Sequence, residues 1–325
     1  MQSVRLRDFI EDREGCLYAV SNYDNAGRIG CILRYVPPDA AGERTNRAGR
    51  RYHKYDFVES FDWIRAHRPD YLDTVHRVPC CDVVRVYKPE EEVAGVAARN
   101  VRVARLLARL SLPAGSFGCT GSLLCGLENE ASDIDLVVYG DAWFVAQRRL
   151  RDLVGGRGGV IPSMSTAMWR KVYDKRVPEI SFDAFVLHEQ RKWNRGGEFE
   201  GTYFDLLYTR AYGNLDAVPA GVGGKVVGRA TIEATVTDAS LSFDSPAVYA
   251  VDHDEISRVL SFTHTYSGQA LAGGGHRGEG CRGGARRRAV ADRRDDPRGE
   301  GRVHRLEDAA RERRVVIRSC LTGHR

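Results

Sequence analysis

Two aspartates one residue apart are the residues of this chain whose types and spacing most favour a specific chemistry. Asp133 and Asp135 stand at the head of an apolar run that continues to Val138. Residues two apart in a strand project to the same face, so the two carboxylates are expected side by side. Two negative charges at such a short distance repel each other, and a Mg²⁺ or Mn²⁺ ion bound between them relieves the repulsion. The pair therefore predicts a divalent metal site.

A Gly-Ser pair precedes the aspartates by a short spacer. Gly121 has no side chain, so its backbone N–H can approach a phosphate closely, and Ser122 adds a hydroxyl. A turn of this kind beside two carboxylates suits a protein that holds a nucleoside triphosphate together with its metal.

The Gly-Ser pair followed by Asp133-Ile134-Asp135 resembles the signature of the DNA polymerase beta-type nucleotidyltransferase superfamily. A longer resemblance, from about residue 1 to about residue 272, is to an archaeal family of predicted nucleotidyltransferases. Its other landmarks are residues 33–37, 51–55, 191–196, 203–207 and 263–266.

The resemblance implies metal-dependent transfer of a nucleoside monophosphate from a nucleoside triphosphate to an acceptor hydroxyl by a two-metal mechanism. RNA, a protein and a small molecule all stay open as the acceptor. The alternative is an RNA-binding or regulatory protein on a catalytically weak nucleotidyltransferase scaffold.

Two-metal phosphoryl chemistry uses a third acid on a neighbouring strand, and two aspartates lie between apolar residues. Asp183 follows Ser181, which predicts an N-cap, so the helix dipole alone explains an acid there. Asp205 lies in the strand-forming segment 202–209. We therefore predict Asp133, Asp135 and Asp205 as catalytic residues and metal ligands, with Asp183 as the alternative third acid.

Basic side chains recur at helical spacing just before that strand. A helix through residue 195 would place four of them on one face, namely His188, Arg191, Lys192 and Arg195. This stripe predicts binding of a triphosphate or an acceptor phosphate, and a solvated helix face is the other interpretation. The predicted nucleotide-binding residues are therefore Gly121, Ser122, Arg191, Lys192 and Arg195.

A second basic segment lies near the N-terminus. The loop 37–50 and the residues after it carry Arg44, Arg50, Arg51 and Lys54. The same two interpretations apply, contact with a phosphate or acceptor and a solvated loop.

Composition limits the function classes. A chain of 325 residues with no apolar run of about 18 residues predicts two or three domains and no membrane span. The charged N-terminus lacks a signal-peptide core, which predicts a cytoplasmic protein. The 8 cysteines include no Cys-x-x-Cys pair, so reduced thiols are favoured over zinc or disulfides.

The excess of positive charge behind the net charge of +5 is concentrated at the C-terminal end of the chain. Residues 273–325 hold 15 Arg, no Lys and 8 acids, which leaves residues 1–272 with a net charge of −2. The overall charge is therefore no evidence that the body of the protein binds nucleic acid.

The pattern of elements predicts an α+β fold whose mixed sheet is flanked by helices. The expected modules are an N-terminal α+β module (1–88), a nucleotidyltransferase domain (89–215), an incomplete β-rich module (216–272) and an Arg/Gly-rich tail (273–325). The expected strands are 16–20, 30–36, 116–120, 202–209, 230–237, 247–251 and 259–266, with another starting at 134. The expected helices are 57–65, one from Pro89 to before Pro113, a short one after Gly121, and 141–154.

The tail has two interpretations. One is a disordered basic arm that binds RNA. The other is a frameshift: 6 Lys against 43 Arg indicate a G+C-rich gene, and permitted codons for 274–284 read one nucleotide later spell an alternating, strand-like sequence. We favour the frameshift.

Overall fold

The computed structural model describes residues 3–37, 42–155, 160–215 and 231–270, and the strand backbones 287–290 and 316–318. The chain divides into two compact units, Met1–Val218 and Pro219–Arg325. Helices and several sheets confirm the predicted α+β class. Among the described residues, no helix combines the length and apolar character needed to cross a membrane.

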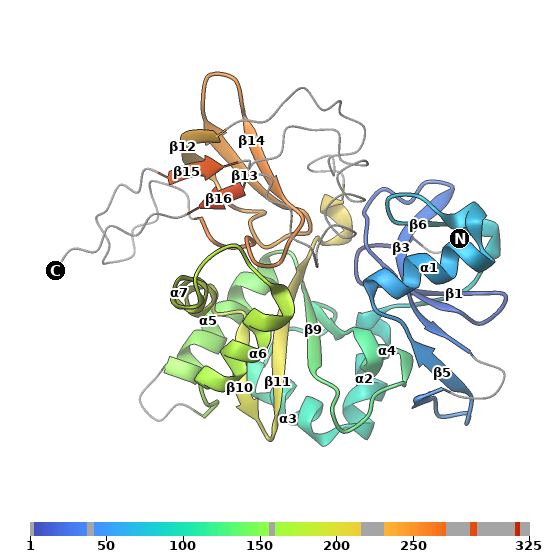
Figure 1. Ribbon diagram of the computed structural model, residues 1–325. Coiled ribbons are helices and arrows are strands. Elements are labelled where there is room, and N and C mark those ends of the chain that lie inside the picture. Colours follow the sequence, from blue (N-terminus) through green and yellow to red (C-terminus); the bar gives the residue numbers. More distant parts are fainter. Residues whose placement is uncertain are drawn as a thin grey trace. The chain divides into compact units, whose positions relative to one another are not determined.

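The N-terminal part of the first unit is a 7-stranded sheet with the order β4-β5-β3-β2-β1-β7, and β6 pairs with β3 (Figure 1). Its strands are β1 Phe9–Asp12, β2 Leu17–Val20, β3 Arg28–Val36, β4 Arg44–Thr45, β5 Arg51–Lys54, β6 His76–Pro79 and β7 Val83–Tyr87. It also contains the helix α1 Phe57–His67 and short 3-10 helices at Pro69–Tyr71 and Cys80–Asp82. The two strands and the helix predicted here are confirmed.

The rest of the first unit is built on a 4-stranded sheet with the order β10-β11-β9-β8. The strands are β8 Phe117–Cys119, β9 Ile134–Tyr139, β10 Arg195–Phe199 and β11 Thr202–Thr209. The helices are α2 Pro89–Arg99, α3 Val101–Leu110, α4 Gly121–Cys125, α5 Asp141–Gly155, α6 Thr166–Arg176 and α7 Phe182–Lys192, and a 3-10 helix follows at Tyr212–Asn214. The predicted order of helix, strand, short helix, strand and helix is confirmed.

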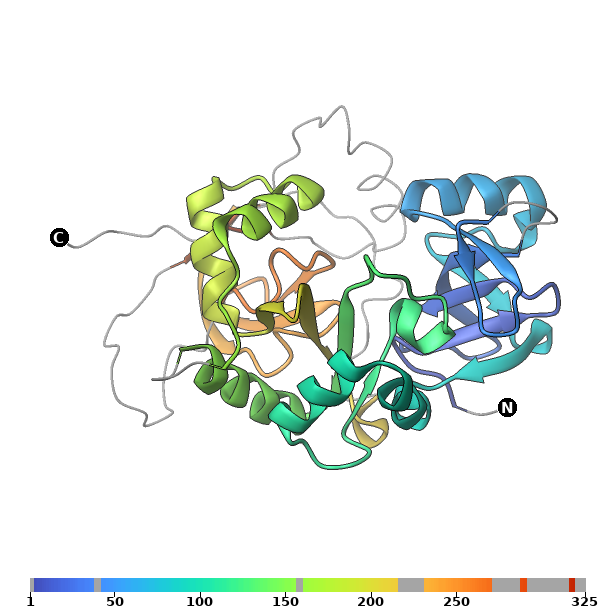
Figure 2. The ribbon, with the colours of Figure 1, turned by 90° about the horizontal axis from the view of Figure 1, so that it is seen from below.

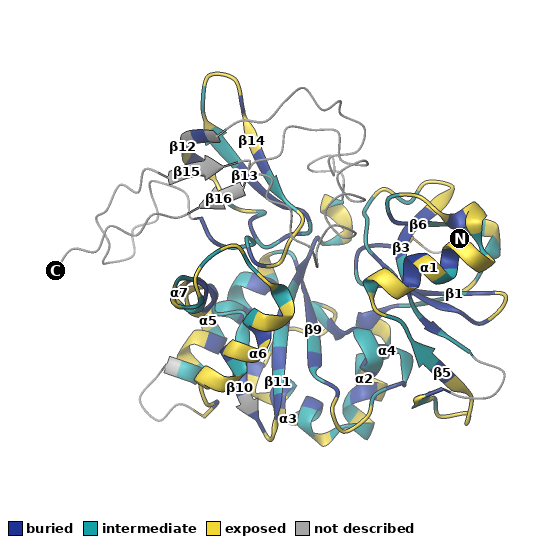
Figure 3. Cartoon of the chain, viewed as in Figure 1, coloured by how far each residue is buried: buried dark blue, intermediate teal, exposed yellow. Residues whose placement is uncertain are grey.

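One face of this sheet is covered by helix. The helix α5 packs against β9 and β11, and the fully buried Trp143 contacts the ring of Tyr208 with centroids 6.1 Å apart. Tyr208, Phe204 and Leu206 share that face, because alternate residues of a strand point the same way. Figure 3 shows the buried residues along both central strands. The opposite face carries the odd-numbered residues of β9 and β11, including the predicted acids.

The short helix α4 joins the two sheets of the unit. Leu124 and Leu127 pack in one cluster with Tyr35 and Tyr52 of the N-terminal sheet. In Figure 2 the green α4 lies against the blue N-terminal strands. Burial of these apolar side chains therefore holds the N-terminal sheet next to the Gly-Ser turn.

Two helix predictions were wrong in extent. The helix that begins at Pro89 breaks at Asn100, whose Oδ1 accepts hydrogen bonds from the N–H groups of Arg102 and Val103 at 3.1 and 3.2 Å. Such an N-cap starts a new helix, α3, whose first residue, Val101, is 57% exposed. The helix expected to reach Arg195 ends at Lys192, because Trp193 adopts a left-handed conformation with φ 49°.

The second unit contains an antiparallel sheet with the order β14-β13-β12-β15-β16. Its strands are β12 Thr231–Asp238, β13 Ala247–Asp252, β14 Arg258–Ser261, β15 Arg287–Val290 and β16 Val316–Arg318. The strand expected over 259–266 stops at Ser261, because the chain turns where the Tyr266 N–H bonds to the Thr263 carbonyl. Two short strands thus come from the tail, whose other residues lie outside the described part, so both interpretations of the tail stay predictions.

The cysteines that the structure describes are free thiols. Cys16, Cys31 and Cys119 are buried, whereas Cys81 is exposed. Cys281 and Cys320 lie outside the described residues.

Close packing of α2 on β8 yields a stability prediction. A Cβ at Gly118 would lie 2.2 Å from the carbonyl carbon of Pro89. Because backbone cannot move aside as a side chain can, we expect Gly118→Ala to lower stability by about 2 kcal/mol. Thermal unfolding followed by circular dichroism measures the effect.

The matched control is Gly95→Ala, which changes a glycine of α2, the helix that packs against Gly118. A Cβ there would meet only the Nη1 atom of Arg99, at 3.9 Å. Alanine favours helix over glycine by about 0.5–1 kcal/mol, so this variant should be slightly more stable. Equal unfolding temperatures for the two variants would contradict the packing argument.

Candidate active site

The predicted acids lie on two neighbouring parallel strands. In the ladder between β9 and β11, Asp135 pairs directly with Asp205. Residues at the same level of a parallel pair point to the same face, so these two carboxylates share the face opposite α5. Asp133 lies one residue before β9 begins. The structure therefore brings the three predicted acids to one end of one sheet.

The Gly-Ser turn lies against Asp135. The Thr120 N–H donates to the Asp135 carbonyl at 3.0 Å, and a Cβ on Gly121 would lie 3.0 Å from the Oδ2 atom of Asp135. Gly121 also has φ +68°, a conformation that residues with a side chain rarely adopt. Both constraints require glycine where the turn meets the carboxylate.

Asp133 is oriented by β11 and by its own preceding loop. The Tyr203 hydroxyl donates to Asp133 Oδ2 at 2.7 Å. Ser132 is held on two sides, because Arg44 Nη1 donates to its hydroxyl at 3.2 Å and the Thr202 hydroxyl donates to its carbonyl at 3.3 Å. The N-terminal sheet and the central sheet thus both position the chain at the first aspartate.

Asp205 faces an arginine of the adjacent edge strand. Arg195 is its partner in the β10–β11 ladder, and Nε lies 3.1 Å from Oδ1. Neither of these two buried atoms has a hydrogen bond, so the contact is an ion pair without a directed N–H. Burial raises the pKa of Asp205, and the charges of Arg195 and Arg176 oppose that shift.

Asp135 is the acid whose negative charge is stabilised least by neighbouring groups. Among the described residues its carboxylate accepts no hydrogen bond. Burial, followed by the charges of Asp133 and Asp205, raises the pKa of Asp135 to about 7. A cation beside it would remove this unfavourable energy, so the site has the electrostatics expected of a metal site.

The donor chemistry also fits a hard cation. Three carboxylates supply oxygen ligands of the kind that Mg²⁺ and Mn²⁺ take in proteins. However, no three His, Cys, Asp or Glu side chains in the described part of the chain converge as a formed metal site. Tyr203 and Arg195 occupy Asp133 and Asp205, and these contacts must loosen before the acids act together. The metal assignment therefore stays a prediction.

The predicted basic stripe is not one exposed face. His188 and Lys192 are 3% and 2% exposed, whereas Arg191 is exposed and Arg195 belongs to β10. The buried face of α7 consists of Phe185, His188, Glu189 and Lys192. Helical spacing cannot distinguish a basic stripe from a buried face that contains an acid, which is the physical reason for the error.

A buried acid pairs with two of these residues, Lys192 and Arg195, and with Arg176. Glu189 contacts Lys192, lies 3.2 Å from Arg176 Nη1 and 3.4 Å from Arg195 Nε. Burial lowers the pKa of Lys192 to about 8, against the attraction of Glu189. Whether these residues bind phosphate stays a prediction, but Lys192 and Arg195 already form ion pairs within the fold.

Sequence reasoning missed Tyr203 and Glu189. Tyr203 could have been found, because strand alternation places it on the face of Asp205. Glu189 gave a weaker signal, its spacing of three from Lys192. Asp183, the alternative third acid, is exposed in the first turn of α7, where the Ser181 hydroxyl accepts from the Ala184 N–H as predicted.

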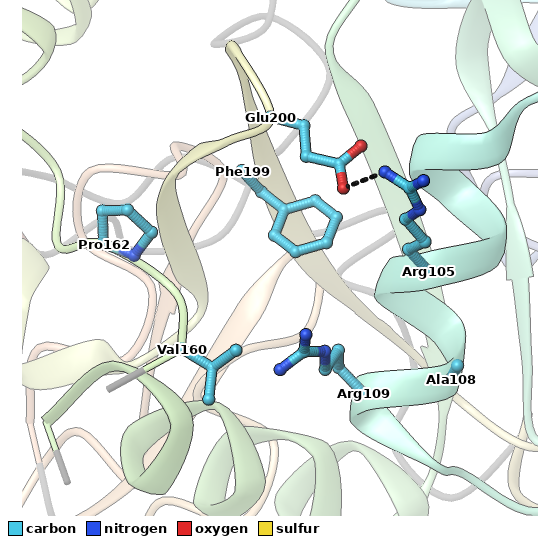
Figure 4. A pocket seen from close by; sticks show the side chains of 7 residues that line it. All are labelled: Arg105, Ala108, Arg109, Val160, Pro162, Phe199 and Glu200. Atoms are coloured by element: carbon cyan, nitrogen blue, oxygen red, sulfur yellow. Dashed lines mark hydrogen bonds and ion pairs between the residues drawn. The ribbon is translucent and has the colours of Figure 1, made fainter. Parts of the chain in front are cut away.

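A cavity of about 450 Å³ lies elsewhere in the first unit, lined by Arg105, Ala108, Arg109, Val160, Pro162, Phe199 and Glu200 (Figure 4). Arg105 pairs with Glu200 at 2.7 Å at its edge. The ring of Phe199 contacts Phe204, which points away from the face of Asp205. This cavity is therefore separate from the carboxylates.

Comparison with known proteins gives a family. The chain is 33% identical over 301 residues to the uncharacterized protein MJ1086 of Methanocaldococcus jannaschii, an alignment that covers 83% of this chain and 88% of that protein. The chain belongs to the same family as this archaeal protein. No family model and no solved structure matches the chain. The function must therefore be argued from the site.

The shifted pKa of Asp135 predicts a pH-dependent stability. Its folded pKa of about 7 exceeds the ordinary value of 3.8, so the folded state binds this proton more tightly than the unfolded chain. The contribution of Asp135 to stability should fall as the pH rises from about 4 to about 7. We expect Asp135→Asn to be more stable than the wild type by about 1–3 kcal/mol at pH 8, with the difference vanishing near pH 4.

Thermal unfolding of both proteins across this range measures the difference. Asp183→Asn is the matched control, because Asp183 is exposed, and it should change stability by less than about 0.5 kcal/mol at any pH. A difference between wild type and Asp135→Asn that does not vary with pH would refute the assignment.

Proposed function

We propose that this protein transfers a nucleoside monophosphate from a nucleoside triphosphate to an acceptor hydroxyl in a reaction that depends on Mg²⁺ or Mn²⁺. The observation that supports it is the pairing of Asp135 with Asp205 across two parallel strands, with Gly121 against the Asp135 carboxylate. A binding protein has no need to bury like charges this close, whereas phosphoryl transfer does.

In this proposal Asp133 and Asp135 would hold both metal ions, and Asp205 would hold the catalytic one. The metals, when bound, supply neutralisation of phosphate charge and activation of the attacking hydroxyl. An acceptor oxygen forms a bond to the α-phosphorus, the bond to the β-phosphate oxygen breaks, and pyrophosphate leaves. The acceptor can be RNA, a protein or a small molecule.

The protein's own groups set the orientation and charge of these acids before substrate binds. Tyr203 fixes the carboxylate of Asp133 through its hydroxyl. Arg195 favours the ionised form of Asp205, which suits an acid that must accept the acceptor's proton. Gly121 leaves its backbone free to approach a phosphate next to Asp135.

One observation favours the alternative, a regulatory or RNA-binding protein on a weak scaffold. Tyr203 and Arg195 already occupy two of the three acids. In a catalyst these contacts must yield to substrate, and in a regulatory protein they would persist. Measured transfer therefore separates the two functions.

The test is incorporation of label from each of the four nucleoside triphosphates, with Mg²⁺ or Mn²⁺, into RNA, protein or lysate small molecules. Asp135→Asn and Asp205→Asn should each lower transfer by about a hundredfold or more, because each removes a metal ligand. Asp183→Asn should retain wild-type transfer. Absence of transfer by the wild type to every acceptor, or full activity of Asp135→Asn, would reject the proposal.

A further inference from the structure

A second group of cations lies on the Asp133 side of the site. Lys54 of β5 is within electrostatic range of Arg34 in β3, Arg44 in β4 and Lys175 in α6, and also of Asp133. The charge of Lys175 acts on Asp135 as well. The group therefore draws on the N-terminal sheet and on the helix α6, and we call Arg34, Lys54 and Lys175 the Lys54 group.

Strand register directs Lys54 toward the acids. Lys54 pairs with Tyr35 across the β3–β5 ladder, so their side chains share a face of the sheet. Tyr35 packs in the same cluster as Leu124 and Leu127, which belong to the segment between the Gly-Ser turn and Asp133. The N-terminal sheet thus presents Lys54 to this segment.

The neighbouring strand β4 confirms the direction. Arg44 Nη1 donates to the Leu127 carbonyl at 3.3 Å and to the Ser132 hydroxyl at 3.2 Å. Ser132 directly precedes Asp133 in the chain. Side chains of β4 and β5 therefore both reach the segment that carries the first aspartate.

The charges of this group are not compensated. Within the part of the chain that the structure describes, the side chains of Arg34, Lys54 and Lys175 make no hydrogen bond or ion pair. Arg44 donates only to uncharged oxygens. The cations around Glu189, by contrast, share a buried carboxylate. Within the described residues, the cations on the Asp133 side thus lack the direct ion pairs that Glu189 and Asp205 make with the cations on the other side.

Lys54 is half-buried among like charges. Burial and the charges of Arg34 and Arg44 lower the pKa of Lys54, and Asp133 only partly offsets them. The neighbouring cations disfavour the charged form of Lys54. An anion with several negative oxygens that binds among them would stabilise all of these positive charges.

We infer that Lys54, Arg34 and Lys175 bind a phosphate group of a substrate beside Asp133. The inference deepens the proposed function and rests on it for the role of the site, since it makes the N-terminal sheet part of the substrate-binding surface. The phosphate can come from the triphosphate of the nucleotide or from an RNA acceptor. In both cases Lys54 supplies charge that the predicted stripe on α7 does not.

Calorimetric titration tests the inference with two probes, inorganic tripolyphosphate with Mg²⁺ and a short single-stranded RNA. Lys54→Met keeps the aliphatic stem and removes the charge, and we expect it to weaken binding of at least one probe about tenfold. Lys171→Met, at an exposed lysine of α6, is the control and should bind within about twofold of wild type. Lys54→Arg should restore binding.

The pattern of loss identifies the source of the phosphate. Weaker binding of tripolyphosphate assigns the group to the nucleotide, and weaker binding of RNA alone assigns it to the acceptor. Wild type that binds neither probe, or Lys54→Met that binds both like wild type, overturns the inference. Circular dichroism melting confirms that the variants are folded.

The outcome is independent of the transfer assay. If Lys54→Met loses binding but the wild type transfers no nucleotide, the phosphate site stands and the proposed function fails. If transfer depends on Asp135 while Lys54→Met binds normally, only this inference fails.

Discussion

Repulsion among three aspartates at one end of a sheet is the interaction on which the rest of the site depends. The parallel pairing of β9 with β11 places Asp135 opposite Asp205, and Asp133 lies two residues before Asp135. The three acids differ in what offsets this repulsion. Asp133 accepts a hydrogen bond from Tyr203, Asp205 pairs with Arg195, and Asp135 has a strongly raised pKa. Because the Asp135 carboxylate has neither a hydrogen bond nor an ion pair among the described residues, Asp135 is the acid that a bound cation would stabilise most.

Two cation groups flank these acids, and their difference decides which of them is free to bind a ligand. On the Asp205 side, Arg176, Lys192 and Arg195 each form an ion pair with the buried Glu189, and Arg195 also pairs with Asp205. A buried acid among buried bases mainly fixes structure, because breaking one partner leaves an uncompensated charge. On the Asp133 side, the described structure gives the Lys54 side chain no ion pair, and Asp133 offsets the repulsion around it only in part. Substrate phosphate therefore has more to gain on the side of the N-terminal sheet.

The sequence predicted what depends on local pattern. Alternation and β-propensity identified β11 and separated Asp205, in a strand, from Asp183, in a helix turn, and the Gly-Ser turn with α4 followed from glycine and the spacing to β9. Packing decided the rest. The same helical spacing describes a basic stripe and the buried face of α7, and only the fold reveals that Glu189 lies among the bases. The break at Asn100 came from a side-chain cap that competes with a continuous apolar stripe.

The sequence named Lys54 in a basic segment with contact to a phosphate as one interpretation, but local pattern could not place it beside Asp133. Its position depends on the contact of Tyr35 and Tyr52 with Leu124 and Leu127, residues far apart in the chain. That contact also lets Arg44 hold Ser132, the residue before Asp133. The apolar cluster therefore does two things at once: it attaches the N-terminal sheet to α4, and it sets the loop from which the first carboxylate projects. Because one interface serves both purposes, the N-terminal sheet cannot be a separate appendage, and the geometry of the acids depends on its packing.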